Sequence, residues 1–535
     1  MGPFAAVRQY LQSIHTQPQV IAGGPGELWP TLAAATAAGI TTILDRSVTV
    51  NMKNTSPSAP VPDEFPEHRS GKQLKIDAAR VRRQLQVLTV DARQGRTSEI
   101  IDQMRDRQDR APARFALPFD RYPVTDLAGR STYVLVARGQ LVVEMDSAGP
   151  GADPRQVLRA LGYRPWKRDV PSPERRTGVP ERRRIGVPER RIGVYEGRKR
   201  PQELAGDVRK LAEMGITAAP HLVVPLGHII KGDDYPYATA ALGEFSPETG
   251  GKSGVPAVRV AVIDTGITPE DRTDNWLDAI VRRADNTEFL DVLPVTDGRA
   301  GDGRLDWSAG HGSFAAGIVQ RVAPRCEVRA YRFTRSDGLG TDKEAAEAML
   351  RAVEEAAADG VRLIINASIG TPAVDGVPPL ALQSTVREIA ERFPEVLIVA
   401  SAGNNGSADP MYPAAFDGVV AVGALTEDLL PAPFSSHGDW VDCSCVGLGV
   451  VATFVTGTLP PVPDPVVADY SFPANSWAVW SGTSFSAPQI SGMVARACVD
   501  DPGLTPRDAL DALLAGRRTI PGYGRVLRVL PGTPV

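Results

Sequence analysis

Short apolar runs rich in β-branched residues alternate with longer amphipathic segments in the second half of this 535-residue chain. The apolar runs are Val258–Ile263, Leu363–Asn366, Val396–Ala400 and Val419–Val422, and the segments with a helical pattern include Asp342–Ala358 and Leu380–Arg392. Strands that are apolar throughout are buried on both faces, and strands separated by helices form parallel sheets covered on each side. The pattern therefore predicts an α/β domain over residues 246–535, with a parallel sheet flanked by helices on both faces.

The region before this domain has a different pattern. Tyr133–Met145 alternates apolar and polar residues and is interrupted by Gly139, which predicts two strands joined by a tight turn. Asp153–Leu161 begins like a capped helix with proline at its first position. Residues 1–163 are therefore predicted to form an α+β extension, a candidate prodomain or regulatory module, and residues 201–245 a segment that leads into the α/β domain.

Residues 164–200 are of low complexity and strongly basic. The sequence PERR begins at positions 173, 180 and 188, and 13 Lys and Arg stand against 5 Asp and Glu, a local net charge of +8. Repeated proline and like charge disfavour a packed core, so the segment is predicted to be a disordered linker. An acidic docking site or a self-cleavage segment remain alternatives.

Composition limits the other classes. A net charge of −4 over 535 residues does not favour nucleic acid as a partner. The four cysteines lack CxxC spacing and are predicted to be reduced, and they are Cys326, Cys443, Cys445 and Cys498. The sequence contains neither an apolar run long enough to span a bilayer nor a basic start followed by one, which predicts a cytoplasmic protein without a membrane partner.

Two polar residues occupy positions suited to chemistry in the α/β domain. Asp264 ends the apolar run of VAVIDTGIT, and ligands gather at the carboxyl ends of parallel strands. His311 opens the small-residue segment HGSFAAGIV, and histidine exchanges protons near neutral pH. Taken alone, each is as well explained by a structural role.

Two further segments add a hydroxyl and an amide. Ser484, in SGTSFSAPQ, stands where a helix begins, because Pro488 fits only a first turn. Free backbone N–H groups at a helix start can hold a developing oxyanion. Asn404 follows the apolar run LIVASAG and can donate a second hydrogen bond to it. Ser484 alone would more often be a helix cap.

All four segments occur in the order Asp, His, Asn, Ser, and the triad order is the one found in subtilisin. They closely resemble the subtilisin family over residues 255–520. Two departures stand out. Phe314 replaces a histidine that many members carry, and the proline-rich stretch Thr458–Asn475 lengthens the loop before the serine.

The resemblance implies a subtilisin-like fold and a serine endopeptidase that acts on peptides or proteins. Ser484 would be the nucleophile, His311 the general base and Asp264 the group that orients the imidazole. Asn404 and the backbone N–H of Ser484 would form the oxyanion hole. The alternative from another class is an inactive subtilisin-like binding or scaffold protein.

The resemblance also implies where a substrate binds. Ser368, Ile369 and Gly370 match one substrate-binding strand of the family, and Leu339 and Gly340 match the opposite one. A peptide would add between them as an antiparallel partner.

Pocket specificity and further ligands are less well indicated. Asp409 and Asp417 follow Asn404 and could select basic residues, although surface positions are the favoured interpretation. The implied chemistry requires neither a metal nor a cofactor, and structural calcium, known in the family, has no signal in these residues. Since family members often carry an inhibitory N-terminal segment, the extension is a candidate intramolecular inhibitor and the chain a candidate zymogen.

Overall fold

The computed structural model describes residues 65–90, 96–112, 115–146, 153–166, 192–226, 235–245, 258–293, 301–460 and 471–535. Most of the low-complexity segment, including every PERR repeat, lies outside these residues. None of the described helices is long and apolar enough to cross a membrane.

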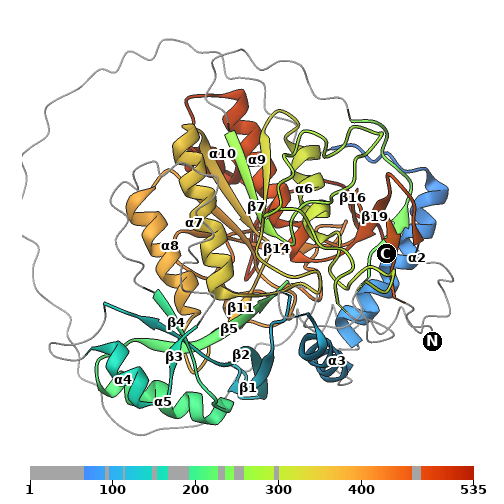
Figure 1. Ribbon diagram of the computed structural model, residues 1–535. Helices are drawn as coiled ribbons and strands as arrows, with labels where there is room; N and C mark the ends of the chain where they lie inside the picture. The colour runs from blue at the N-terminus through green and yellow to red at the C-terminus, as the bar shows by residue number, and fades with distance from the viewer. Residues whose placement is uncertain are drawn as a thin grey trace, which may run out of the picture. The chain divides into compact units, whose positions relative to one another are not determined.

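An eight-stranded sheet forms the centre of the α/β domain (Figure 1). Its strands, in spatial order, are β20 (Thr519–Ile520), β21 (Gly524–Val526), β15 (Cys443–Val446), β14 (Val419–Leu425), β12 (Leu397–Ser401), β10 (Arg362–Ala367), β7 (Val258–Asp264) and β8 (Glu327–Arg332). All neighbouring pairs are parallel except β20 with β21. The four predicted apolar runs are all strands of this sheet, which confirms the predicted fold class.

Helices cover both faces of the sheet. On one face α6 (His311–Val322) packs against α9 (Ala487–Asp500), with α10 (Pro506–Leu514) beside it, and on the other face α7 (Asp342–Asp359) packs against α8 (Leu380–Arg392). Alternate residues of one strand enter the two cores, because successive side chains point to opposite faces. In β7, Val260 and Val262 join the core with α6 and α9, whereas Ala261 and Ile263 join the core with α7 and α8.

A smaller module precedes the α/β domain. Its elements are β1 (Phe119–Thr125), β2 (Ser131–Glu144), α4 (Pro154–Ala160), β3 (Arg164–Pro165), β4 (Ile192–Glu196), α5 (Pro201–Glu213) and β5 (Ala218–Pro225). The strands follow the order β3-β4-β2-β5, with β1 paired to β2. The two helices bury Leu158, Leu204 and Leu211 against one face of this sheet. As predicted, Asp153 caps α4 and Pro154 opens it.

Two sequence predictions for this module are wrong. Tyr133–Met145 is not a hairpin, because β2 runs unbroken through Gly139 and its pairing with β5 shifts register nearby. Gly139 has a φ of 69°, and a Cβ there would lie 2.1 Å from the carbonyl oxygen of Gly197, so glycine permits the irregularity without a turn. The predicted linker over residues 164–200 is too long, since β3 and β4 pair with each other and β4 also pairs with β2.

Several short elements complete the structure. Helices α2 (Gly71–Val90) and α3 (Arg96–Arg110) precede the module. An antiparallel sheet in the order β16-β19-β6 joins β16 (Val450–Thr453), β19 (Trp477–Trp480) and β6 (Tyr237–Thr239). The remaining elements are β9 (Leu339–Thr341), β11 (Thr371–Pro372), β13 (Met411–Tyr412), β17 (Gly457–Thr458), β18 (Ser471–Phe472) and the 3₁₀ turn η4 (Thr483–Phe485). The four cysteines are free, as predicted.

Candidate active site

Asp264 and His311 form a buried pair at the carboxyl end of the central sheet. Asp264 is the last residue of β7, and His311 is the first residue of α6. The Nδ1 atom of His311 lies 2.7 and 2.9 Å from the two carboxylate oxygens of Asp264. The backbone N–H of Thr265 donates a third hydrogen bond to this carboxylate, at 2.7 Å. These contacts fix the plane of the imidazole and favour the tautomer that is protonated at Nδ1.

Two glycines allow α6 to approach β7 this closely. Gly310 caps the start of the helix with a φ of 87°, a backbone conformation that residues with a side chain rarely adopt. A Cβ at Gly312 would lie 2.3 Å from the backbone oxygen of Gly266, in the turn that follows Asp264. The backbones of the motifs HGS and DTG are therefore in direct contact, with no room for a side chain at Gly312.

Glu288 is a site residue that sequence reasoning missed. It is buried beside the pair, where its carboxyl group accepts hydrogen bonds from the hydroxyl of Thr265, the N–H of Gly310 at 2.7 Å and the hydroxyl of Ser313 at 3.1 Å. Burial, and to a smaller extent the charge of Asp264, raise its pKa to about 8 although these hydrogen bonds lower it. No motif in DNTEFL marks this residue, so only the fold reveals that it links the segments of Asp264 and His311.

Ser484 lies in η4, between β19 and α9. Its side chain is 1% exposed, and its backbone oxygen accepts a hydrogen bond from the hydroxyl of Ser368 at 2.9 Å. Among the described residues, the Oγ atom of Ser484 has no hydrogen-bond partner. The ring of the next residue, Phe485, packs against the His311 imidazole with centroids 5.2 Å apart. This contact brings the serine segment to the Asp264–His311 pair.

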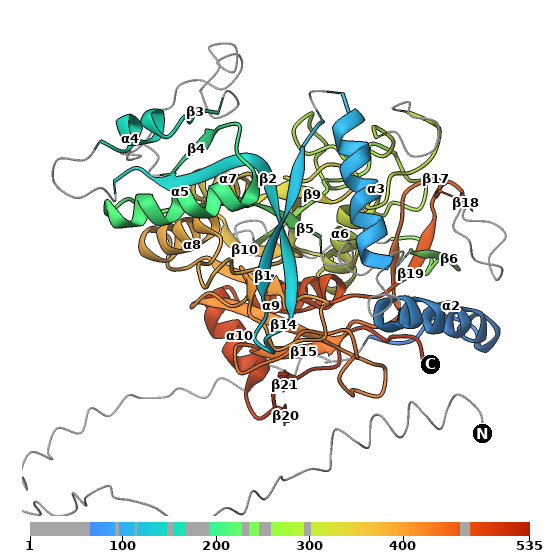
Figure 2. The ribbon, with the colours of Figure 1, turned by 90° about the horizontal axis from the view of Figure 1, so that it is seen from below.

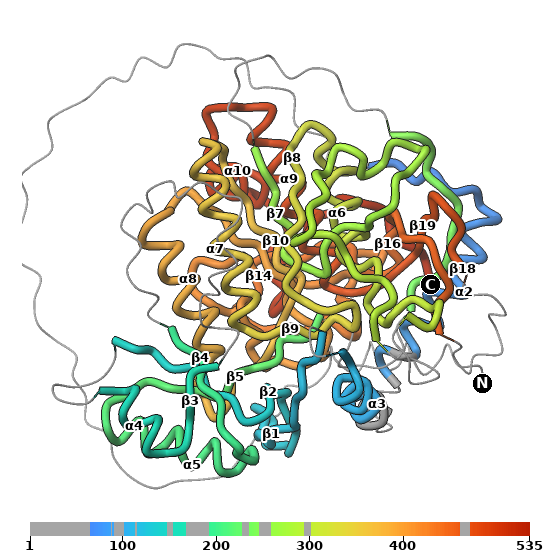
Figure 3. The backbone as a smooth tube through the Cα atoms, in the orientation of Figure 1, coloured from blue at the N-terminus to red at the C-terminus, as the bar shows by residue number. Residues whose placement is uncertain are grey.

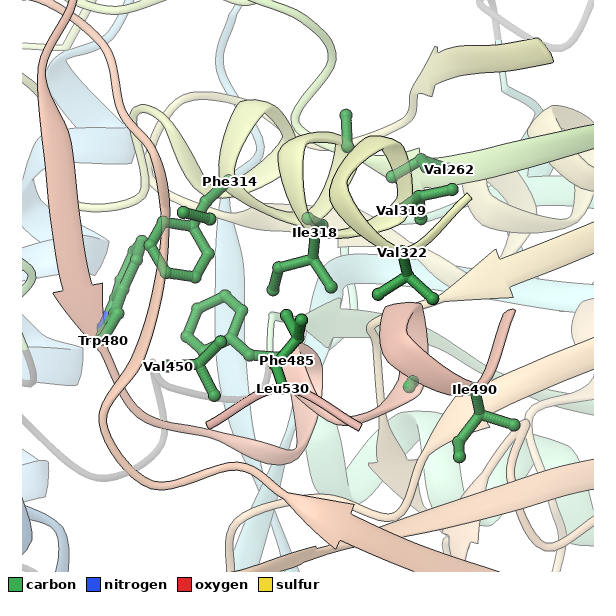
Figure 4. Packing of buried hydrophobic residues seen from close by; sticks show 14 of the residues in the cluster. Val262, Phe314, Ile318, Val319, Val322, Val450, Trp480, Phe485, Ile490 and Leu530 are labelled. Atoms are coloured by element: carbon green, nitrogen blue, oxygen red, sulfur yellow. The ribbon is translucent and has the colours of Figure 1, made fainter. Parts of the chain in front are cut away.

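An aromatic cluster supports that contact. Figure 4 shows Phe314, Trp480 and Phe485 side by side, from α6, β19 and η4. The centroid of Phe314 lies 4.5 Å from that of Phe485, and Trp480 packs edge-on against both His311 and Phe314. Phe314, the departure noted in the sequence, is therefore a core residue behind the imidazole.

Asn404 holds the turn that carries Ser484. Its side-chain oxygen accepts hydrogen bonds from both the N–H and the hydroxyl of Thr483, each at 2.9 Å. The N–H of Gly403 in turn donates to the hydroxyl of Thr483 at 3.1 Å. These hydrogen bonds fix the orientation of the side-chain amide. Its Nδ2 atom lies near Gly482, 3.4 Å from the position that a Cβ would take there.

The two segments expected to bind substrate both contact a strand of this chain. β5 pairs antiparallel with β9, with Val224 opposite Gly340 and Pro225 opposite Leu339. The next residue, Leu226, forms an antiparallel bridge to Ile369. Figure 2 shows β5 next to β9, and β5 also pairs with β2, so the sheet of the small module continues into the α/β domain.

The remaining sequence candidates lie elsewhere. The carboxylate of Asp409 accepts a hydrogen bond from the N–H of Leu127, in the turn between β1 and β2, and Asp417 is exposed. Their favoured interpretation as surface residues agrees with these positions. The stretch Thr458–Asn475 begins at the last residue of β17 and includes β18, which pairs with β17, and residues 461–470 lie outside the described residues.

Comparisons with known proteins assign a family to the α/β domain. Residues 256–520 match the model of the Subtilase family. This part of the chain is therefore a subtilase domain. The chain is 30% identical over 285 residues to the thermophilic serine proteinase of Bacillus sp. (strain AK1), a match that covers 52% of this chain and 61% of that protein. It is 28% identical over 254 residues to subtilisin BL of Lederbergia lenta, covering 46% and 77% of the two chains.

Among solved structures, the chain is similar to fervidolysin from Fervidobacterium pennivorans, a keratinolytic enzyme related to subtilisin. The TM-score is 0.48 at 18% identity, and the match covers 74% of this chain and 60% of that one.

Proposed function

We propose that this chain is a serine endopeptidase in which Asp264, His311 and Ser484 form the catalytic triad. The observation that carries the proposal is the buried Asp264–His311 pair, with both carboxylate oxygens within 2.9 Å of Nδ1 and with the neighbour of Ser484 packed on the same imidazole. A histidine bound by a carboxylate at Nδ1 has Nε2 available as a base, which is what a serine nucleophile requires.

The proposed reaction follows from these contacts. The Oγ atom of Ser484 attacks the peptide carbonyl and gives its proton to Nε2 of His311, while Asp264 stabilises the imidazolium ion. The carbonyl oxygen becomes an oxyanion, which accepts hydrogen bonds from Nδ2 of Asn404 and the backbone N–H of Ser484. His311 then protonates the leaving amine, and water hydrolyses the acyl-enzyme by the same steps in reverse order.

The same proposal assigns an inhibitory role to the small module. Val224–Leu226 lies antiparallel to β9 and bridges to Ile369, which is the pairing expected of a bound peptide. Leu226 is buried in this position. The segment therefore occupies the substrate strands of its own chain, and the full-length protein is a self-inhibited form.

A labelling experiment tests the activity. A serine-directed fluorophosphonate should label the wild-type chain slowly, and an unstructured protein should be cleaved slowly by it, because Val224–Leu226 occupies the proposed substrate strands. Ser484→Ala should abolish both activities. Ser491→Ala is the matched control, because Ser491 lies on α9 and bonds the side chain of Asn366. The measurements are repeated with Leu226→Asp, which weakens the segment in the cleft. If neither chain is labelled, the protein is an inactive scaffold and the proposal fails.

A further inference from the structure

Helix α2 precedes the small module and lies far outside the family match, yet it packs into the core of the subtilase domain. Figure 3 shows it beside β19, and Val81 and Leu88 are buried in the same core cluster as α6 and α9. Just before the helix, Arg69 donates to the hydroxyl of Thr533 at 2.8 Å and to the carbonyl of Gly532 at 2.6 Å. The helix is thus anchored at both the middle and the start.

One side chain of α2 reaches the loop that carries the proposed nucleophile. Gln84 is 1% exposed, and its Nε2 atom donates to the carbonyl oxygens of Tyr235 at 2.9 Å and Val479 at 3.0 Å. Its Oε1 atom accepts a hydrogen bond from the hydroxyl of Ser481 at 2.7 Å. The amide therefore uses its acceptor oxygen and one donor hydrogen on the subtilase domain, and the other donor hydrogen on Tyr235, which precedes that domain.

Ser481 is three residues before Ser484, and the intervening residues are also held. The N–H of Gly482 donates to Gly447 O at 2.8 Å, and Thr483 is bound by Asn404. The hydroxyl of Ser481 also accepts a hydrogen bond from the N–H of Gly449 at 3.0 Å. Gln84 adds a contact to this loop from outside the matched domain.

We infer that Gln84 is a positioning residue for Ser484, and that α2 thereby contributes to the activity of the peptidase. This inference rests on the proposed function. The geometry requires a neutral amide, because two carbonyl oxygens face its nitrogen and one hydroxyl faces its oxygen. An apolar replacement leaves the two buried carbonyl oxygens and the Ser481 hydroxyl without these hydrogen bonds. The Ser481 side chain would then rotate toward another acceptor, which would shift the turn that carries Ser484. Catalysis is sensitive to such shifts, since a misplacement of about 1 Å can cost about 100-fold in rate.

The test compares Gln84→Met with Gln73→Met. Methionine keeps the length of glutamine and removes its hydrogen bonds. Gln73 lies on the same helix and bonds Asp77 at 2.8 Å and Thr239 at 3.2 Å, without contact to the nucleophile loop. Steady-state kcat and KM, the rate of fluorophosphonate labelling and Tm are measured on each full-length chain. Gln84→Met should lower kcat and the labelling rate by about 10- to 100-fold with KM within about twofold, whereas Gln73→Met should leave kcat unchanged.

Ser481→Ala removes the other partner of the same hydrogen bond and should lower kcat in the same way. The loss of kcat in the double variant should be smaller than the product of the two single losses, because both changes remove the hydrogen bond between Gln84 and Ser481. If Gln84→Met fails to fold, Ser481→Ala still reports on the bond. Equal kcat in Gln84→Met, Ser481→Ala and wild type, with only Tm reduced, would overturn the inference. Absence of labelling in both wild type and Leu226→Asp would instead overturn the proposed function.

Discussion

Glu288 provides a quantitative test of the site, because its carboxyl group is buried between the segments of Asp264 and His311. Its pKa is raised from 4.5 to about 8, chiefly by burial. In the unfolded chain it ionises near its ordinary pKa, whereas in the folded chain it keeps its proton until about pH 8. The folded state therefore binds more protons between these values, and its stability falls as the pH rises. At 1.36 kcal/mol for each pKa unit, the loss is about 3 kcal/mol at pH 7 and about 5 kcal/mol at pH 9.

The perturbation is Glu288→Gln, which resembles the protonated acid in shape and hydrogen bonding and does not titrate. Urea unfolding is measured from pH 4.5 to 9 in a Ser484→Ala background, which prevents self-cleavage. Relative to its value at pH 4.5, the advantage of the variant in free energy of unfolding should grow to about 3 kcal/mol at pH 7 and about 4 kcal/mol at pH 9. Comparing the two chains cancels the titration of other groups.

The control is Glu395→Gln, which changes an exposed carboxylate to the same amide. It should give the same pH dependence as the unmodified chain. A difference between Glu288→Gln and its parent that stays constant from pH 4.5 to 9 would refute the reasoning, because Glu288 would then be ionised equally in the folded and unfolded states.

Two other changes test the close packing of α6 against the turn after β7, and the occupation of the proposed substrate strands by Val224–Leu226. Gly312→Ala should lower both kcat and Tm, because its Cβ would lie 2.3 Å from the Gly266 backbone oxygen. Its control is Gly206→Ala on α5, where a Cβ has no atom within 4 Å and kcat should be unchanged. Equal effects of the two substitutions on kcat would contradict the close packing of α6. Leu226→Asp should raise the rate of fluorophosphonate labelling at least about tenfold, since burying a carboxylate costs far more than the 1.4 kcal/mol that a tenfold change requires. Met214→Asp, at an exposed position of the same module, is its control, and a labelling rate unchanged by Leu226→Asp would mean that β5 does not block the site.

The sequence predicted those parts of the site that depend on local patterns. Strand ends, helix starts and small residues placed Asp264, His311 and Ser484 on the correct elements, because the apolar runs and capping residues that indicate these elements lie within a few residues of each side chain. The buried strands of the sheet were found for the same reason. The prediction of a turn at Gly139 was wrong, since a glycine that permits an irregular strand looks the same in sequence as one that permits a turn.

The residues that were missed act over long distances in the chain. Glu288 is 24 residues after Asp264 and 23 before His311, and nothing near it indicates a polar environment. Gln84 meets Ser481 across 397 residues. The occupation of β9 by β5 likewise depends on how two modules pair. Such contacts are made by the tertiary fold, and a single sequence without local motifs at those positions cannot indicate them.

The two proposals give the N-terminal region opposite effects on the subtilase domain. Val224–Leu226 pairs with β9 and bridges to Ile369, which are the proposed substrate strands, and Gln84 of α2 bonds Ser481 in the loop of the proposed nucleophile. Gln84 and Val224–Leu226 both lie N-terminal to the subtilase domain. If a cut after Leu226 released everything before it, the proposed substrate strands would become free and Gln84 would be lost at the same time. The buried contacts of Arg69, Val81 and Leu88 oppose that loss, because they bind α2 to the domain independently of β5. If both proposals hold, an active form must therefore keep α2 bound while β5 leaves, and intact-mass analysis of labelled protein under native conditions should find a fragment containing Gln84 associated with the one containing Ser484.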